Sequence, residues 1–223
     1  MKKAVVIVAG GSGSRMRSDI PKQFLLLRGR PILMHTIERF YSYCRNIKII
    51  VVLPQNEIER WNHLCLDYHF TIQHEVAQGG DTRYHSVKNG LALAENGTIV
   101  GIHDGVRPLV STAVIKKCYE EASANKAVIP AIPAVDSLRM VTAEGNSAID
   151  RSSIRLVQTP QVFPSEMLTN AYKQQYTSTF TDDASVVEAY GIPITIVEGN
   201  VENIKITNPI DLAIADSIFD SVI

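Results

Sequence analysis

The chain has 223 residues, of which 45% are hydrophobic, and its 22 basic and 23 acidic side chains give a formal net charge of −1. This length and apolar content suffice for one hydrophobic core, so we expect a single domain over residues 1–223. Because the charges balance, no general electrostatic field attracts nucleic acid or an anionic membrane surface. We therefore expect neither as a partner, and an anionic ligand must be met by a local cluster of cations.

The cysteines and the N-terminal residues indicate the compartment. Cys44, Cys65 and Cys118 are odd in number and widely spaced, without a Cys-x-x-Cys pair, so neither a disulfide framework nor a zinc site is predicted. The apolar run before the first glycine is too short for a signal-peptide core, and no run approaches the about 18 apolar residues that a membrane-spanning helix needs. We expect a reduced, cytoplasmic protein that is neither exported nor membrane-spanning.

The first predicted element is a buried β-strand over residues 4–8, which read Ala-Val-Val-Ile-Val. A glycine-rich turn follows, with Gly10, Gly11 and Gly13. Glycines allow the backbone to turn tightly and to bring bare N–H groups against an anion, while Arg15 and Lys22 supply positive charge on the same side. The turn therefore predicts a nucleoside triphosphate site, and the alternative is a flexible loop that carries two surface cations.

The better-known glycine motifs do not describe this turn. A dinucleotide-binding fingerprint requires a third glycine where Met16 stands and an acidic residue where Leu33 stands. A Walker A loop requires Gly-Lys followed by Ser or Thr, which the sequence lacks. The nucleotide site is thus predicted to be of another kind.

Two helices and four further strands follow the turn in the predicted order. Pro31 lies in the first turn of a helix with Ile37 and Phe40 on its apolar face, and Asp81 is expected to cap a second helix that buries Tyr84 and Leu91. Short β-branched runs stand at residues 47–53, 98–102, 127–132 and 193–197. The alternation predicts an α/β fold, a single Rossmann-like, mostly parallel sheet flanked by helices.

Residues 133–160 interrupt this alternation. Two short strands around the turn Glu144-Gly145-Asn146-Ser147 predict a β-hairpin. A hairpin that projects from an α/β domain exposes apolar side chains unless a partner covers them. We therefore expect residues 133–160 to form a dimerisation arm.

Several blocks resemble the 2-C-methyl-D-erythritol 4-phosphate cytidylyltransferase family and occur in the order typical of that family. They are Ala-Gly-Gly-Ser-Gly-Ser-Arg-Met at 9–16, Pro-Lys-Gln-Phe at 21–24, Gly-Gly-Asp-Thr-Arg-Tyr-His-Ser-Val at 79–87, His-Asp-Gly-Val-Arg-Pro at 103–108, Gln-Thr-Pro-Gln at 158–161 and Glu-Asn-Ile-Lys-Ile-Thr-Asn-Pro at 202–209. The resemblance implies a homodimeric nucleotidyltransferase that moves CMP from CTP to 2-C-methyl-D-erythritol 4-phosphate and releases pyrophosphate, in non-mevalonate isoprenoid precursor synthesis.

The resemblance also implies roles for individual residues. Arg15 and Lys22 become the catalytic cations that stabilise the phosphorus under attack, and the nucleotide-binding set is Ala9, Gly10, Gly11, Gly13, Gly80, Asp81 and Ser86. From the residues alone, Lys22 could equally be a solvated loop lysine and Asp81 only a helix cap.

A second set is implied to position the polyol phosphate: Lys205, Asp104, Arg107, and from the arm Arg151 and Ser137. Arg151 would act on the partner's site if the arm is exchanged, and Ser137 stands where the family usually has threonine. Asp104 follows a strand at its carboxyl end, where open α/β sheets bind ligands. It could bind a hydroxyl group or Mg²⁺, or it could only pair with Arg107 and shape the loop. Gly105 and Val106 depart from the usual family pattern.

Mg²⁺ is the expected cofactor, because a triphosphate brings its own ion and holds it largely through phosphate oxygens. Asp104 is the candidate protein ligand, and no dedicated metal cage is predicted. Two other functions remain open: a ribitol-5-phosphate cytidylyltransferase that makes CDP-ribitol, and a nucleotide-binding regulatory protein without turnover.

Overall fold

The structure, a computed structural model, describes residues 1–10 and 20–222. Its main sheet has eight strands in the order β10-β7-β11-β6-β1-β4-β5, with β12 paired to β7. The strands of this sheet are β1 (Lys2–Val8), β4 (Lys48–Leu53), β5 (Glu75–Gln78), β6 (Thr98–Asp104), β7 (Ala127–Pro133), β10 (Arg155–Val157), β11 (Gln161–Pro164) and β12 (Ile194–Glu198). The predicted mostly parallel sheet is confirmed, since β1 pairs in parallel with both β4 and β6, β4 with β5, and β12 with β7.

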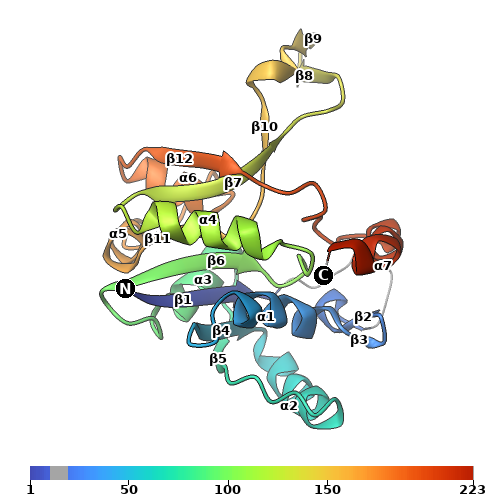
Figure 1. Ribbon diagram of the computed structural model, residues 1–223. Coiled ribbons are helices and arrows are strands. Elements are labelled where there is room, and N and C mark those ends of the chain that lie inside the picture. Colours follow the sequence, from blue (N-terminus) through green and yellow to red (C-terminus); the bar gives the residue numbers. More distant parts are fainter. Residues whose placement is uncertain (11–19, 223) are drawn as a thin grey trace.

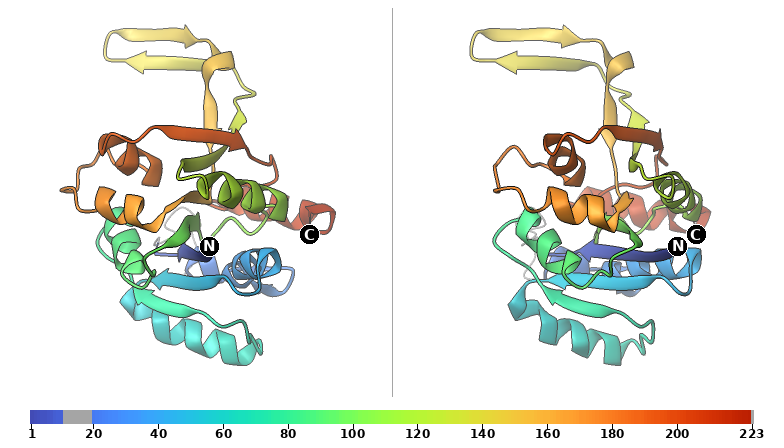
Figure 2. Two further views of the ribbon diagram at one scale, coloured as in Figure 1. Left: turned by 60° about the vertical axis from the view of Figure 1, so that its left-hand side comes forward. Right: turned by 90° about the vertical axis from the view of Figure 1, so that its left-hand side faces the viewer.

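Helices cover both faces of this sheet (Figures 1 and 2). They are α1 (Ile32–Tyr43), α2 (Ile58–Asp67), α3 (Arg83–Leu91), α4 (Thr112–Ala122), α5 (Ser165–Ala171), α6 (Asp183–Ala189) and α7 (Pro209–Val222). The alternation of side chains along β1 divides the core: Val5 and Ile7 face the cluster that includes α1, α2 and α4, whereas Ala4 and Val6 face the cluster that includes α3, α5 and α6. A third cluster joins α7 to the loops after β1 and β6.

The starts of the two predicted helices are each displaced by about one residue. Pro31 is the N-cap of α1 and lies just before its first turn. Thr82, and not Asp81, is the N-cap of α3, and its hydroxyl oxygen accepts a hydrogen bond from the backbone N–H of His85. The prediction that Asp81 caps this helix is therefore wrong.

The predicted hairpin is present and projects from the body of the molecule (Figure 1). Strands β8 (Leu138–Thr142) and β9 (Gly145–Ile149) pair with each other and not with the main sheet. Their register places Ala143 and Glu144 in the turn, so the turn begins one residue earlier than predicted. The chain leaves the sheet at the end of β7 and returns through the short helix Arg151–Ser153 to β10, which pairs antiparallel with β7.

Three further short elements connect these parts: the two-stranded ribbon of β2 (Leu26–Leu27) and β3 (Arg30–Pro31), and the 3₁₀ helices Lys22–Phe24 and Gln55–Glu57. Within residues 1–10 and 20–222 there is no helix long and apolar enough to cross a membrane.

Candidate active site

A cavity of about 460 Å³ opens at the carboxyl ends of β1 and β6. The chain runs from β1 outward to β4 and β5 and then returns to β6 on the other side of β1, so the strand order reverses here. Open α/β sheets bind ligands at such a switch point. Its lining residues are Val8, Ala9, Gly10, Lys22, Gln23, Gly80, Asp81, Thr82, Arg83, Ser86, Asp104, Val106 and Lys205.

Lys22 reaches the cavity from the first position of the 3₁₀ helix Lys22–Phe24. Pro21 precedes this helix with its carbonyl oxygen bonded to the N–H of Phe24, and Phe24 is buried and stacks on Trp61 with ring centroids 6.1 Å apart. The aromatic anchor fixes the turn and so holds Lys22 at the cavity wall.

The turn before α3 forms another part of the cavity wall. The hydroxyl oxygen of Ser86 accepts the N–H of Gly80 at 3.1 Å, so that N–H is not free to contact a ligand. A Cβ atom at Gly80 would lie only 2.5 Å from the Cβ of His85, which explains why glycine is needed here. Asp81 is exposed at this wall of the cavity.

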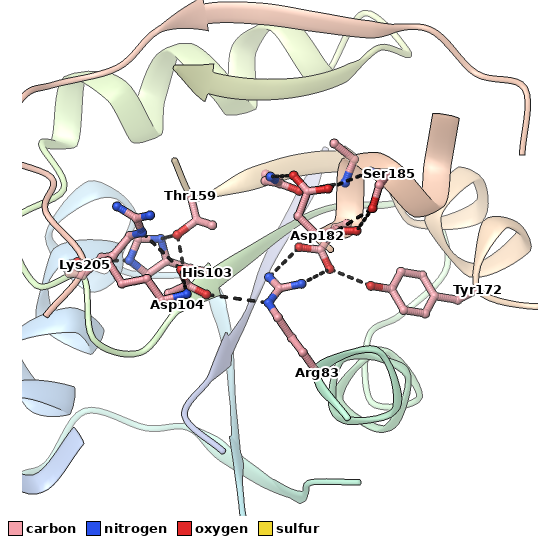
Figure 3. A network of polar contacts seen from close by, with 12 residues as sticks. Arg83, His103, Asp104, Thr159, Tyr172, Asp182, Ser185 and Lys205 are labelled. Atoms are coloured by element: carbon pink, nitrogen blue, oxygen red, sulfur yellow. Dashed lines mark hydrogen bonds and ion pairs between the residues drawn. The ribbon is translucent and has the colours of Figure 1, made fainter. Parts of the chain in front are cut away.

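Asp104 ends β6 in the midst of three cations (Figure 3). Its Oδ2 lies 3.0 Å from Nζ of Lys205 and 3.2 Å from Nε of Arg107, and its Oδ1 lies 3.7 Å from Nε of Arg83. Burial alone would raise the pKa of this carboxyl group, but the three cations outweigh it and hold the pKa well below its ordinary value. Asp104 is therefore an ionised carboxylate at the centre of a cationic cluster.

The position of Lys205 is fixed by two buried residues close to it in the sequence, Asn203 and Ile206. Ile206 is fully buried and its N–H donates to the carbonyl of Val106, while the buried Asn203 side chain donates to the carbonyl of Thr159 at 2.8 Å. The segment belongs to no helix or strand, and its Lys205 side chain is 40% exposed. The sequence pattern correctly predicted that Lys205 points away from the core.

A neutral histidine, His103, is linked to the backbone of Asp104 through the hydroxyl group of Thr159. Burial lowers the pKa of His103 to about 3, so its imidazole is uncharged at neutral pH. Its Nε2 lies 3.1 Å from the carbonyl of Arg107 and its Nδ1 lies 3.0 Å from the Thr159 hydroxyl, which in turn accepts the N–H of Asp104. A carbonyl can only accept, so the proton is on Nε2 and Nδ1 accepts from Thr159.

Eight of the predicted site residues line the cavity: Ala9, Gly10, Lys22, Gly80, Asp81, Ser86, Asp104 and Lys205. Arg107 lies behind Asp104, where it also donates to the carbonyl of Asn203 at 2.6 Å. Arg151 and Ser137 belong to the projecting arm and do not line the cavity, and Arg151 instead donates to the carbonyl of Val135. Gly11, Gly13 and Arg15 lie outside the described residues.

The surroundings of Asp104 do not suit a metal ligand, because both of its oxygens face cations. No group of three or more metal-binding side chains occurs in the part of the chain that the structure describes. A metal ion in this cavity would therefore have to be coordinated chiefly by the phosphate groups of a bound nucleotide.

Sequence reasoning missed Arg83 and Gln23. Arg83 is the first residue of α3 and links the cavity to a buried carboxylate of α6, Asp183, in an arrangement that only the folded chain brings together. Gln23 is 1% exposed, and neither polar atom of its side chain has a hydrogen-bond partner in the described structure. In the sequence, only the position of Gln23 between Lys22 and the apolar Phe24 could have indicated that it lies at the site.

Comparison with known proteins identifies the family. The family model of 2-C-methyl-D-erythritol 4-phosphate cytidylyltransferase matches residues 3–221. The chain is 54% identical over 218 residues to the protein of that name from Bacteroides thetaiotaomicron, covering 98% of this chain and 100% of the relative. It is 48% identical over 221 residues to the one from Porphyromonas gingivalis, covering 99% of each.

Solved structures agree as well. The enzyme of the same name from Thermus thermophilus has a TM-score of 0.79 at 32% identity, with 98% of each chain covered. The one from Francisella tularensis has a TM-score of 0.80 at 34% identity, covering 97% of this chain and 99% of that one. With the cavity, its cations and these matches taken together, the chain belongs to the 2-C-methyl-D-erythritol 4-phosphate cytidylyltransferase family.

Proposed function

We propose that this protein transfers CMP from CTP to 2-C-methyl-D-erythritol 4-phosphate and releases pyrophosphate. The observation that carries the proposal is the convergence of Lys22, Lys205 and the Gly80 turn on one cavity at the carboxyl ends of β1 and β6. A nucleotide and a phosphate monoester both bring negative charge, and the two lysines supply positive charge where they meet.

In the reaction, a phosphate oxygen of the acceptor attacks the α-phosphorus of CTP. The new P–O bond joins acceptor and cytidylyl group, while the bond to the β-phosphate breaks and its electron pair leaves with pyrophosphate. Such a transfer needs positioning and cationic stabilisation more than covalent help. We assign stabilisation of the reacting phosphorus to Lys22, with Arg15 as its partner from the turn, and anchoring of the acceptor phosphate to Lys205.

The acceptor is the methylerythritol phosphate rather than ribitol phosphate. Support comes from the matched family and from relatives at 54% and 48% identity, which carry the name of the methylerythritol phosphate enzyme. The retained cations also favour an enzyme over a nucleotide-binding regulator without turnover.

We further propose a homodimer formed through the arm. Support comes from apolar side chains that the arm leaves exposed, including Val135 and Val141, which are 78% and 79% exposed. Arg151 and Ser137, which do not line the cavity of their own chain, would then serve the active site of the partner subunit.

Mg²⁺ is proposed to enter with CTP and to be held mainly by its phosphate oxygens. Its chemistry there is neutralisation of the triphosphate charge, and no protein ligand is assigned to it. The cytoplasm remains the expected compartment, supported by the free cysteines Cys44, Cys65 and Cys118.

Pyrophosphate release tests the proposal, with purified protein, Mg²⁺ and CTP, and with methylerythritol phosphate or ribitol phosphate in separate reactions. Release with the first acceptor alone is expected. Release with ribitol phosphate alone would move the chain to CDP-ribitol synthesis, and binding of CTP without release under either acceptor would favour the regulatory protein.

A further inference from the structure

Arg83 joins the cavity to a buried carboxylate at the start of α6, Asp183 (Figure 3). Its Nη1 and Nη2 donate to the two oxygens of Asp183 at 3.0 and 2.7 Å, in the bidentate geometry that fixes a guanidinium plane. The Asp183 side chain is fully buried, whereas that of Arg83 is 28% exposed at the cavity wall. The Nη1–Nη2 edge of the guanidinium group is thus anchored in the core, while Nε lies on the side of Asp104.

The anchor itself is rigid. The hydroxyl group of Tyr172 donates to Oδ1 of Asp183 at 2.6 Å. Asp183 begins α6, whose N-cap Asp182 accepts from the amide of Gln161 at 2.7 Å, and Gln161 Oε1 in turn accepts the N–H of Ala184. These contacts leave the Asp183 carboxylate, and with it Arg83, little freedom to turn.

The free side of Arg83 faces the carboxylate that holds Lys205. Nε of Arg83 lies 3.7 Å from Oδ1 of Asp104, and the other oxygen of Asp104 lies 3.0 Å from Nζ of Lys205. When several cations surround one carboxylate, each cation is attracted less strongly, because the other cations repel it and offset part of the negative charge. Arg83 therefore limits how strongly Asp104 retains Lys205, and its charge lies on the Oδ1 side of the carboxylate, whereas Lys205 contacts Oδ2.

We propose that Arg83 is a positioning residue for the acceptor phosphate: anchored by Asp183, it orients Asp104 and leaves Lys205 available to a phosphate monoester. This inference rests on the proposed function, since it concerns how the same site binds its acceptor. It assigns Arg83 no contact with the reacting atoms. The alternative is that the Arg83–Asp183 pair only ties α3 to α6.

The test is a pair of neutral replacements, Arg83→Gln together with Asp183→Asn, which can still hydrogen-bond to each other and to Tyr172. They remove one cation and one anion, so the net charge of the cluster is unchanged and a changed KM reports orientation. Asp183 is not left as an unpaired buried charge, which would be strongly destabilising. Arg28→Gln with Asp220→Asn is the matched control, because this pair lies at 2.6 Å on the surface and does not line the cavity.

The expected result is a KM for methylerythritol phosphate raised about tenfold, with the KM for CTP and kcat near those of the wild type. The control should retain both KM values. In a double-mutant cycle, the Arg83 and Asp183 replacements should add little to the KM effect of Lys205→Ala, because both act on the same contact. If the double replacement fails to fold, Arg83→Lys carries the same cycle, since it keeps the charge but loses the bidentate grip.

Three results would overturn the inference: an unchanged KM for the acceptor, KM values that rise equally for both substrates, or full additivity with Lys205→Ala. The wild-type reaction separates this failure from that of the proposed function. Turnover by the wild type with any of these results would remove the role of Arg83 alone, whereas a wild type without turnover would overturn both.

Discussion

At the scale of single residues, the site depends on charges that are held but not fully neutralised. Asp104 is shared among Arg83, Arg107 and Lys205, so its single negative charge does not neutralise all three cations. Lys22 lines the same cavity from the 3₁₀ helix Lys22–Phe24. We propose separate tasks for the two lysines, one at the reacting phosphorus and one at the acceptor phosphate.

Lys22→Ala is expected to lower kcat by about 10²–10³-fold, the usual effect of removing one group that stabilises transition-state charge. The fold should survive, because Phe24 anchors the turn in the core and Lys22 is not part of that packing. Steady-state pyrophosphate release measures the effect. Lys126→Ala, at a surface lysine paired with Glu121, is the control, and a Lys22→Ala enzyme as active as this control would remove the assigned role.

At the scale of secondary structure, α3 packs closely against the sheet at Gly90. A Cβ atom at Gly90 would lie 2.5 Å from Cγ1 of Val6 and 2.8 Å from Cγ2 of Val52, both in central strands. Gly90→Ala should therefore lower the free energy of unfolding by about 1–3 kcal/mol despite the better helix propensity of alanine. Urea unfolding measures it, and a stabilised variant would show that helix and sheet separate more easily than this packing implies.

The arm is a second element with a direct test. Val141 and Met140 are 79% and 55% exposed on β8, and the proposed dimer would cover them. Met140→Asp with Val141→Asp should yield monomers in sedimentation and lower turnover, because Arg151 would then be unable to reach the site of a partner subunit in the way we propose. Wild-type protein that sediments as a monomer at enzyme-assay concentrations would contradict the dimer.

Most of the sheet could be predicted because its buried parallel strands are long runs of β-branched residues, such as those of β4. Strand β11 could not, since it has only four residues, ends in Pro164 and pairs antiparallel between β6 and β7. Asp104 could be assigned to the site because it stands at the end of a strand and Lys22 because it follows the glycine-rich turn, whereas Lys205 was assigned only by resemblance to the family. Arg83 could not be, because nothing in its local sequence reveals that Asp183, a hundred residues later, meets it.

At the scale of the whole molecule, stability should decline on acidification. His103 is neutral in the folded protein because burial lowers its pKa to about 3 from 6.5, whereas in the unfolded chain it takes up a proton below about pH 6.5. Unfolding then binds a proton, so the free energy of unfolding falls by up to about 1.4 kcal/mol per pH unit between those values. The carboxyl group of Asp104, whose pKa is lowered, adds a loss of the same sign at lower pH.

Denaturant unfolding from pH 7 to pH 4 measures this dependence. His103→Gln is the informative variant, because its amide can still donate toward the Arg107 carbonyl but does not titrate. Its slope against pH should be shallower than that of the wild type. An identical slope would show that His103 is not the group responsible.

The most direct test of the central claim, that this cavity joins a cytidylyl group to an acceptor phosphate, is ³¹P NMR of the protein with CTP, Mg²⁺ and methylerythritol phosphate. We expect the signals of CTP and of the phosphate monoester to be replaced by the two coupled resonances of a mixed diphosphate, in amounts equal to the pyrophosphate released. Loss of CTP to pyrophosphate and CMP, with the monoester unchanged, would instead show a hydrolase and contradict the account.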